Sequence, residues 1–209
     1  YSSWSLRPWL FLHAFGVDTD DRILPLDTPQ FREQIGALSP TARVPALHHD
    51  GVIVWDSLAI CEYANEAFLD GRGLPADRAV RAVARSVCAE MHSGFQSLRT
   101  ECPMNVRRRV DPPAKLSESA QGDIERVCSI WRECRARYGA GGDFLFGAFS
   151  MADAFFAPVA TRFRTYGVTV GAVERRYMDA IFALPAFREW EAMSVAETES
   201  LPKYDRIGA

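Results

Sequence analysis

The sequence predicts a mixed α/β segment followed by an all-helical segment. Three observations support this fold class. Residues 1–70 alternate short helical and strand patterns, residues 77–196 carry almost only helical periodicity, and a Gly- and Pro-rich stretch lies between them. We therefore expect two domains, residues 1–70 and 77–209, joined by a linker at residues 71–76.

Composition excludes several classes of protein. The 209 residues are 48% hydrophobic and 24% charged, with a formal net charge of −3, which is typical of a soluble globular protein. No apolar run reaches the roughly 18 residues that a membrane helix needs. The only basic cluster, Arg107–Arg109, reads best as a solvated helix face, so neither nucleic acid nor membrane is expected as a partner.

The five cysteines show neither a C-x-x-C pair nor zinc-ligand spacing. No metal is therefore expected. An odd number of cysteines without a disulfide framework fits the reducing cytoplasm, where we expect the protein to be located.

In the first segment, a helix is expected where Leu6, Leu10 and Ala14 recur at helical spacing, with Pro8 in its first turn and Gly16 at its end. Asp50-Gly51 is a strong hairpin signal. In order, the pattern then predicts an edge strand at Arg22–Leu26, a short helix opened by Thr28-Pro29, strands at Arg43–Leu47 and Val52–Trp55, and a helix capped by Ser57.

In the second segment, a long helix is expected from Asp77 to about Arg109, interrupted near Cys102-Pro103. A further helix should run from Ser117 to Tyr138. Ser150 followed three residues later by Asp153 is a capping signature, and Pro185 opens the last predicted helix.

Serine residues precede the first helix in the run Ser2-Ser3-Trp4-Ser5. A helix N-terminus stabilises anions, and a hydroxyl there can donate a hydrogen bond to a bound thiolate. Lowering a thiol pKa by roughly 2 units needs about 2.7 kcal/mol, within reach of one charge-assisted hydrogen bond of about 1.5–3 kcal/mol. The alternative is that these serines only cap the helix.

Two further pairs carry possible binding chemistry. Val44-Pro45 opens a strand with a residue that lacks a backbone donor, which suits either a sheet edge or a position beside a ligand. A cis bond there would expose the backbone of Val44 to a partner. Asp56-Ser57 could hold an ammonium and a carboxylate, the two charged groups of an α-amino acid, although a simple helix cap is the alternative.

Together these motifs resemble the cytosolic glutathione S-transferases, and the resemblance covers nearly the whole chain. It is carried by Tyr1-Ser2-Ser3-Trp4-Ser5-Leu6-Arg7-Pro8-Trp9-Leu10, Ala42-Arg43-Val44-Pro45-Ala46-Leu47, Trp55-Asp56-Ser57-Leu58-Ala59-Ile60 and Ser150-Met151-Ala152-Asp153. The fold implied is an N-terminal thioredoxin-like α/β domain followed by an all-α domain, usually in a homodimer.

The resemblance also implies roles for individual residues. Ser2 or Ser3 would be the catalytic serine that stabilises the thiolate of glutathione, the co-substrate. Candidate co-substrate-pocket residues lie on the long helix, at His92, Gln96 and Arg99, with a dimer-interface or solvent role as the alternative. The implied glutathione-binding residues are Trp4, Ser5, Arg43, Val44, a cis Pro45, Asp56 and Ser57; Arg43 could equally point to solvent.

The serine run is most similar to the Ser-Ser-Cys-Ser pattern of the zeta class, in zeta-like bacterial members. Trp4 stands where that pattern has cysteine, which puts a cysteine contribution to isomerisation in doubt. The expected function is a glutathione transferase acting on an electrophilic, largely apolar co-substrate. The alternatives are a glutathione-dependent isomerase or dehalogenase, similar to maleylacetoacetate isomerase, and a non-catalytic protein-interaction module.

The thioredoxin-like pattern opens with a strand that should end near Tyr1. That strand does not occur in the sequence. Because it would be central in the sheet, we expect the polypeptide to extend upstream by about 5–10 residues, one strand's length.

Overall fold

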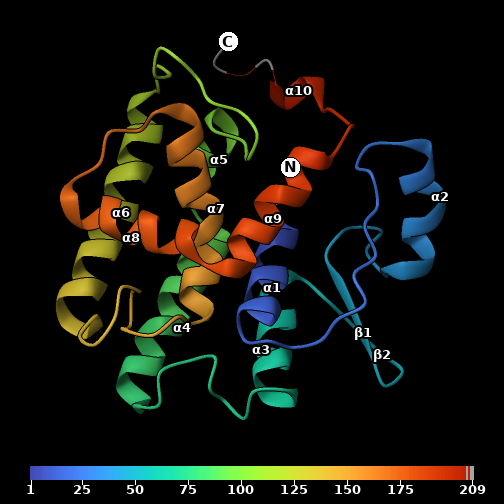
Figure 1. Cartoon of the computed structure of the whole chain (residues 1–209), viewed down its shortest axis with the longest axis horizontal. Coiled ribbons are helices and arrows are strands. Elements are labelled where there is room, and N and C mark those ends of the chain that lie inside the picture. Colours follow the sequence, from blue (N-terminus) through green and yellow to red (C-terminus); the bar gives the residue numbers. More distant parts are fainter. Residues whose placement is uncertain (206, 208–209) are drawn as a thin grey trace.

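The computed structural model describes residues 1–205 and residue 207. Helices form most of the molecule, and a small antiparallel sheet lies at one side, next to α2 (Figure 1). The elements are α1 (Ser3–Ala14), α2 (Pro29–Leu38), β1 (Ala46–His49), β2 (Val52–Trp55), α3 (Ser57–Ala67), α4 (Arg78–Ser93), α5 (Gln96–Glu101), α6 (Glu118–Tyr138), α7 (Met151–Tyr166), α8 (Ala172–Ala183), α9 (Pro185–Ala196) and α10 (Pro202–Asp205).

Side-chain caps start the helices of the first segment. Ser2 caps α1, Thr28 caps α2 and Asp56 caps α3, each accepting a backbone N–H from two or three residues further on at 2.8–3.1 Å. The cap on α2 follows the prediction. The prediction that Ser57 caps α3 is wrong, because Ser57 is the first residue of that helix and the preceding aspartate supplies the cap.

The hairpin signal at Asp50-Gly51 is confirmed. Both residues have positive φ, 47° and 79°, as a tight turn between twisted antiparallel strands requires. The strands pair from Ala46 opposite Trp55 to His49 opposite Val52. The turn therefore sets the register, and β2 ends directly before Asp56, the cap of α3.

The strand expected at Arg22–Leu26 does not form in the structure. Within the described part of the chain, β1 pairs with β2 and no strand lies beside residues 22–26. A strand is stable only when its backbone groups have partners, so the apolar pattern alone is not sufficient here. Residues 22–26 instead line one wall of a cavity of about 830 Å³, and β1 lines another.

The long helix expected from Asp77 to Arg109 is divided. The helix starts where expected, with Asp77 as the cap of α4, but α4 ends at Ser93, and Phe95 has left-handed geometry with a φ of 62°. A right-handed helix cannot continue through such a residue. The side chain of Phe95 is only 7% exposed, so burial of its ring in the core accompanies the change of direction. The short helix α5 follows and ends before Cys102-Pro103.

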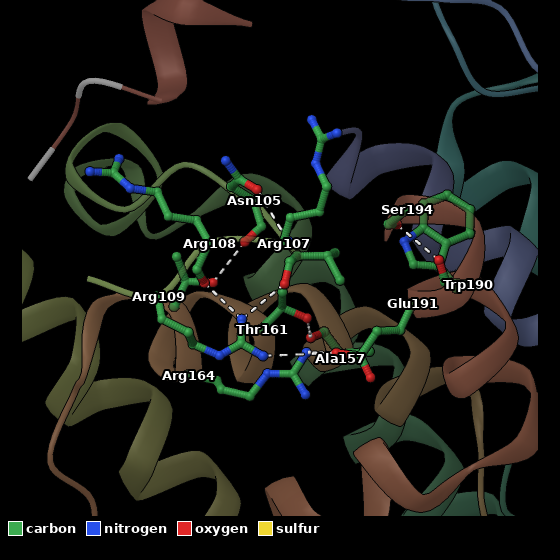
Figure 2. A network of polar contacts seen from close by, with 12 residues as sticks. Asn105, Arg107, Arg108, Arg109, Ala157, Thr161, Arg164, Trp190, Glu191 and Ser194 are labelled. Carbon is green, nitrogen blue, oxygen red and sulfur yellow. Dashed lines mark hydrogen bonds and ion pairs between the residues drawn. The ribbon is translucent and has the colours of Figure 1, made fainter. Parts of the chain in front are cut away.

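The basic cluster Arg107–Arg109 is not a solvated helix face, because it lies beyond α5 in irregular chain. Arg107 donates to the carbonyl oxygens of Glu197 and Glu199 at 2.6 and 2.7 Å. Arg108 donates to that of Ile207 at 2.6 Å. Figure 2 shows the three arginines, with Arg164 and Glu191 close to Arg109. The cluster attaches the C-terminal segment to the body of the molecule.

Helix α7 is the buried centre of the helical part and packs against α1, α4 and α8. Its N-terminus confirms the predicted signature: the carboxylate of Asp153 accepts the backbone N–H of Ser150 at 2.8 Å and its hydroxyl at 2.9 Å. The second oxygen of Asp153 accepts the N–H of Leu145 at 3.0 Å. One buried carboxylate thus fixes both the helix start and the loop before it.

The two parts of the chain meet at Gly73, which follows α3. Its N–H donates to the Asn65 side chain at 2.8 Å, and its carbonyl accepts the N–H of Met151 at 2.8 Å. A Cβ at this position would lie 2.3 Å from the ring of Phe11. Only glycine allows the connection to pass this close to α1 and α7.

Candidate functional site

The N-terminus of α1 lies at the cavity described above. Ser2 is half-buried, its Oγ accepts the N–H of Ser5 at 3.1 Å, and the two hydroxyl groups lie 2.8 Å apart. Ser2 and Ser5 line the cavity together with Val44 and Pro45. The free N–H groups and the positive end of the helix dipole therefore face a space that a ligand can enter.

Ser3 lies on the other side of the helix start, inside the protein. Its side chain is 7% exposed, and its hydroxyl accepts a hydrogen bond from Nη2 of Arg162 on α7 at 3.0 Å. Arg162 also donates to the carbonyl oxygen of Cys102 at 2.6 Å. Burial lowers the pKa of Arg162 to about 10, so it remains a cation at neutral pH. The two candidate serines thus have different surroundings.

Val44 and Pro45 are joined by a cis peptide bond and are half-buried at the cavity wall, directly before β1. Arg43 precedes them and is exposed.

Asp56 lies at the end of β2 with a φ of 73°. One carboxylate oxygen accepts the N–H of Leu58 at 2.8 Å, and the other lies 3.2 Å from Nε2 of His92 on α4. Ser57 is 1% exposed, and its hydroxyl accepts a long hydrogen bond of 3.4 Å from Arg7. The aspartate is therefore open to solvent on one side, whereas the serine is covered.

Arg7 is a residue of this region that the sequence patterns did not single out. It is fully buried, and its guanidinium carbon lies 4.4 Å from the ring centre of Trp4 and 4.8 Å from that of Phe155. Among the described residues, its Nε and Nη2 have no hydrogen-bond partner. Burial, together with the nearby cations Arg99 and Arg162, lowers its pKa to about 9. The sequence feature that could have indicated a buried Arg7 is its position three residues before Leu10, on the inward face of α1.

Two of the three residues expected to line a co-substrate pocket lie together, and the third lies apart. His92 contacts Asp56 and Arg7. Arg99 donates to backbone carbonyls at the end of α4, including that of Gly94 at 2.8 Å, and its guanidinium carbon lies 5.0 Å from the ring centre of Trp4. Gln96 is exposed and its amide lies 3.4 Å from the hydroxyl of Thr100. His92 and Arg99 meet around Trp4, and Gln96 lies apart from them.

Residues 1–205 and 207 contain no group of three or more side chains that could hold a metal ion. In the same part of the chain, no helix is both long enough and apolar enough to cross a bilayer.

Comparison with known proteins identifies the family of the chain. Residues 1–67 match the family model described as glutathione S-transferase, N-terminal domain, and residues 107–192 match the corresponding C-terminal domain model. The chain belongs to the glutathione S-transferase family.

Relatives are found across almost the full length. The chain is 28% identical to maleylacetoacetate isomerase from Rattus norvegicus over 201 residues, covering 90% of this chain and 87% of the relative. A shorter match, to maleylacetoacetate isomerase from Mus musculus, is 37% identical over 47% of each chain.

Solved structures show the same fold. A glutathione transferase homolog from Burkholderia GL BGR1, determined with bound glutathione, superposes with a TM-score of 0.69, 27% identity and coverage of 94% of both chains. Maleyl pyruvate isomerase, described as a bacterial glutathione S-transferase in the zeta class, gives a TM-score of 0.71 at 22% identity over 96% of both chains.

Proposed function

We propose that this protein is a glutathione transferase in which the hydroxyl of Ser2 stabilises the thiolate of bound glutathione for attack on an electrophilic, largely apolar co-substrate. One observation carries the choice of residue. Ser2 lines the same cavity as Val44 and Pro45, whereas the hydroxyl of Ser3 is buried and already engaged by Arg162.

The energetics of thiol activation are modest. Lowering a thiol pKa by about 2 units requires about 2.7 kcal/mol in favour of the thiolate. A hydroxyl donating to an anion contributes about 1.5–3 kcal/mol, and a helix N-terminus adds about 0.3–1 kcal/mol. Ser2 caps α1, so it can supply both effects at one point. The Ser2 oxygen accepts the Ser5 N–H, and its own proton can turn from the Ser5 hydroxyl, 2.8 Å away, to a bound thiolate.

The rest of the glutathione molecule would be held at two other points. The backbone of Val44 would pair with the cysteinyl unit, and Asp56 with Ser57 would receive the ammonium and carboxylate of the γ-glutamyl unit. Trp4 and Ser5 flank the thiol position, and Arg43 could move towards the glycyl carboxylate. The exposure of Asp56 and the position of Val44 at the cavity wall support this arrangement.

The reaction would then be a direct displacement or addition. The thiol proton leaves to solvent, and the sulfur lone pair forms a bond to the electrophilic carbon. In a displacement the leaving group departs with its bonding electrons. In an addition the π electrons of the double bond move to the far carbon, which takes up a proton from solvent. The protein would contribute thiolate stabilisation and the proximity of two bound reactants.

A glutathione-dependent isomerase is the second candidate, favoured by the full-length relative named maleylacetoacetate isomerase. In that reaction the thiolate would add to a conjugated double bond, allow rotation and leave again, so glutathione is not consumed. Product analysis separates the two candidates, because only the transferase incorporates glutathione into its product.

The test is a titration with glutathione of the wild type and of Ser2→Ala, Ser3→Ala and Ser57→Ala, followed by thiolate absorbance and by turnover on activated halides and alkenes. We expect Ser2→Ala to bind glutathione but raise the bound thiol pKa, and Ser57→Ala to weaken binding. Failure of the wild type to bind glutathione or to lower its thiol pKa would overturn the proposal and favour a non-catalytic module. An effect confined to Ser3→Ala would move the role to Ser3.

The family resemblance also supports a homodimer, which light scattering of the purified protein tests directly. A monomeric mass at micromolar concentration would contradict it.

A further inference from the structure

His92 lies between two charged residues from different parts of the fold. Its Nε2 is 3.2 Å from a carboxylate oxygen of Asp56, in the turn between β2 and α3. Its Nδ1 is 3.4 Å from Nη1 of Arg7 on α1. One imidazole on α4 therefore joins the helical part of the chain to the turn that carries Asp56.

The contact with Arg7 defines the tautomer of His92. A guanidinium group has donors but no acceptor, so Nδ1 of the imidazole must accept and Nε2 must carry the proton. The Nε2–H then donates to Asp56. Burial is the main cause of the lowered pKa of His92; Arg7 and Arg99 also lower it, and Asp56 opposes them. The imidazole is accordingly neutral, and its contact with Asp56 is a hydrogen bond.

The ring is also held laterally by aromatic neighbours. The Trp4 ring meets it edge-on at 5.3 Å between centres, and the Phe155 ring lies at 6.2 Å. These contacts and the two hydrogen bonds leave the imidazole little freedom to turn.

Asp56 is consequently fixed on two sides. One oxygen receives the N–H of Leu58 and the other receives His92. A carboxylate offers about four lone-pair positions, so acceptor capacity remains for a cationic ligand group. The side chain is 45% exposed, which leaves that capacity accessible.

We propose that His92 is a positioning residue: from the helical part of the chain, it orients the Asp56 carboxylate to receive the ammonium group of the ligand. This rests on the proposed function, in which that ligand is glutathione and the ammonium is the α-amino group of its γ-glutamyl unit. His92 then acts in glutathione binding, and it has no part in holding the electrophile.

The test compares binding of glutathione and of an analogue in which hydrogen replaces the α-amino group, by calorimetry. His92→Phe keeps a ring of similar shape but no polar atom, and His92→Gln keeps one donor and one acceptor. Ser93→Ala is the matched control, on the exposed next residue of α4. The wild type should prefer glutathione over the analogue by about tenfold or more.

We expect His92→Phe to lose most of that preference, to leave the dissociation constant of the analogue unchanged and to raise the KM for glutathione alone. His92→Gln should restore part of the preference. Equal weakening of both ligands would indicate a purely structural role and overturn the proposal, as would an intact preference in His92→Phe.

A ligand-free measurement separates this inference from the proposed function. Nitrogen chemical shifts of the imidazole should report a neutral ring protonated at Nε2 at pH 7, and His92→Phe should change the signals of Asp56. A wild type that binds no glutathione but shows this tautomer would overturn the proposed function and confine His92 to holding Asp56. A ring protonated at Nδ1 would overturn the positioning role itself.

Discussion

The guanidinium carbon of Arg7 lies 4.4 Å from the ring centre of Trp4, so an exposed aromatic side chain covers a fully buried cation. The ring centre of Phe155 lies 4.8 Å from the same carbon. The negative faces of two aromatic rings partly compensate the charge, and this matters because two nitrogens of Arg7 lack hydrogen-bond partners. Trp4, at the position where the zeta-class pattern has cysteine, therefore stabilises the buried charge of Arg7.

Removing the Trp4 ring should destabilise the protein. We expect Trp4→Ala to lower the free energy of unfolding in urea by about 1–2 kcal/mol, since a partly desolvated cation–π contact contributes about 0.5–2 kcal/mol. Trp4→Phe should cost less. Trp55, which is 46% exposed compared with 38% for Trp4, is the matched control, because the described residues place no arginine over it. Equal losses for Trp4→Ala and Trp55→Ala would contradict the role of the stacked cation.

Arg7 should tolerate replacement by an apolar side chain of similar length better than truncation. Arg7→Met removes a buried, incompletely paired charge, so we expect the free energy of unfolding to change by less than about 1 kcal/mol or to rise. Arg7→Ala also leaves a cavity and should cost about 2–5 kcal/mol. Urea denaturation of both variants tests this. A loss for Arg7→Met as large as that for Arg7→Ala would show that the cation itself stabilises the fold.

Asp153 makes stability depend on pH. Burial raises its pKa from 3.8 to about 6, so the folded state binds more protons than the unfolded state between these values. The contribution of Asp153 to stability is therefore full below about pH 4 and falls as pH rises through 6, by at most about 3 kcal/mol.

Urea unfolding of wild type and Asp153→Asn across this range isolates the effect. The variant should be less stable than the wild type, because an amide offers one acceptor oxygen to the three donors that bind Asp153. The difference in unfolding free energy, wild type minus variant, should shrink as pH rises from 4 to 6. The exposed Asp179→Asn is the control. A difference that grows with pH would show that Asp153 keeps an ordinary pKa.

Two glycines should respond to alanine with opposite sign. Gly73→Ala would place a methyl group 2.3 Å from the ring of Phe11 and should lower the unfolding free energy by about 1–3 kcal/mol. Gly122 lies within α6 with nothing inside 4 Å of the added carbon, so Gly122→Ala should raise it by about 0.5–1 kcal/mol. Thermal or urea unfolding of both variants is sufficient. Destabilisation by both would mean that helix propensity does not control the effect in α6.

Features controlled by a few adjacent residues could be predicted from the sequence. The Asp50-Gly51 turn, the Thr28 cap and the Ser150–Asp153 cap each depend on contacts within three residues, and all three formed as expected. The family resemblance in turn placed the motifs in the correct fold.

Features that depend on distant residues could not be predicted in this way. The environments of Ser3 and Ser2 differ because of Arg162, which lies 159 residues from Ser3. The break at Phe95 follows from where its ring finds space in the core, and residues 22–26 lack a neighbouring strand regardless of their own pattern. No local spacing indicates which side chain covers Arg7 or what lies beside a strand.

Helix α7 and helix α2 differ sharply in burial: α7 is buried along nearly its whole length, whereas α2 buries only Ile35. Local opening of a region costs less free energy when fewer apolar contacts must be broken. In native-state hydrogen exchange, the amides of α7 should therefore exchange only through global unfolding, and those of α2 through small openings that leave α7 intact. A ligand held at Val44, close to α2 in the chain, would first slow the exchange of amides in and around α2. It would leave the amide exchange rates in α7 almost unchanged.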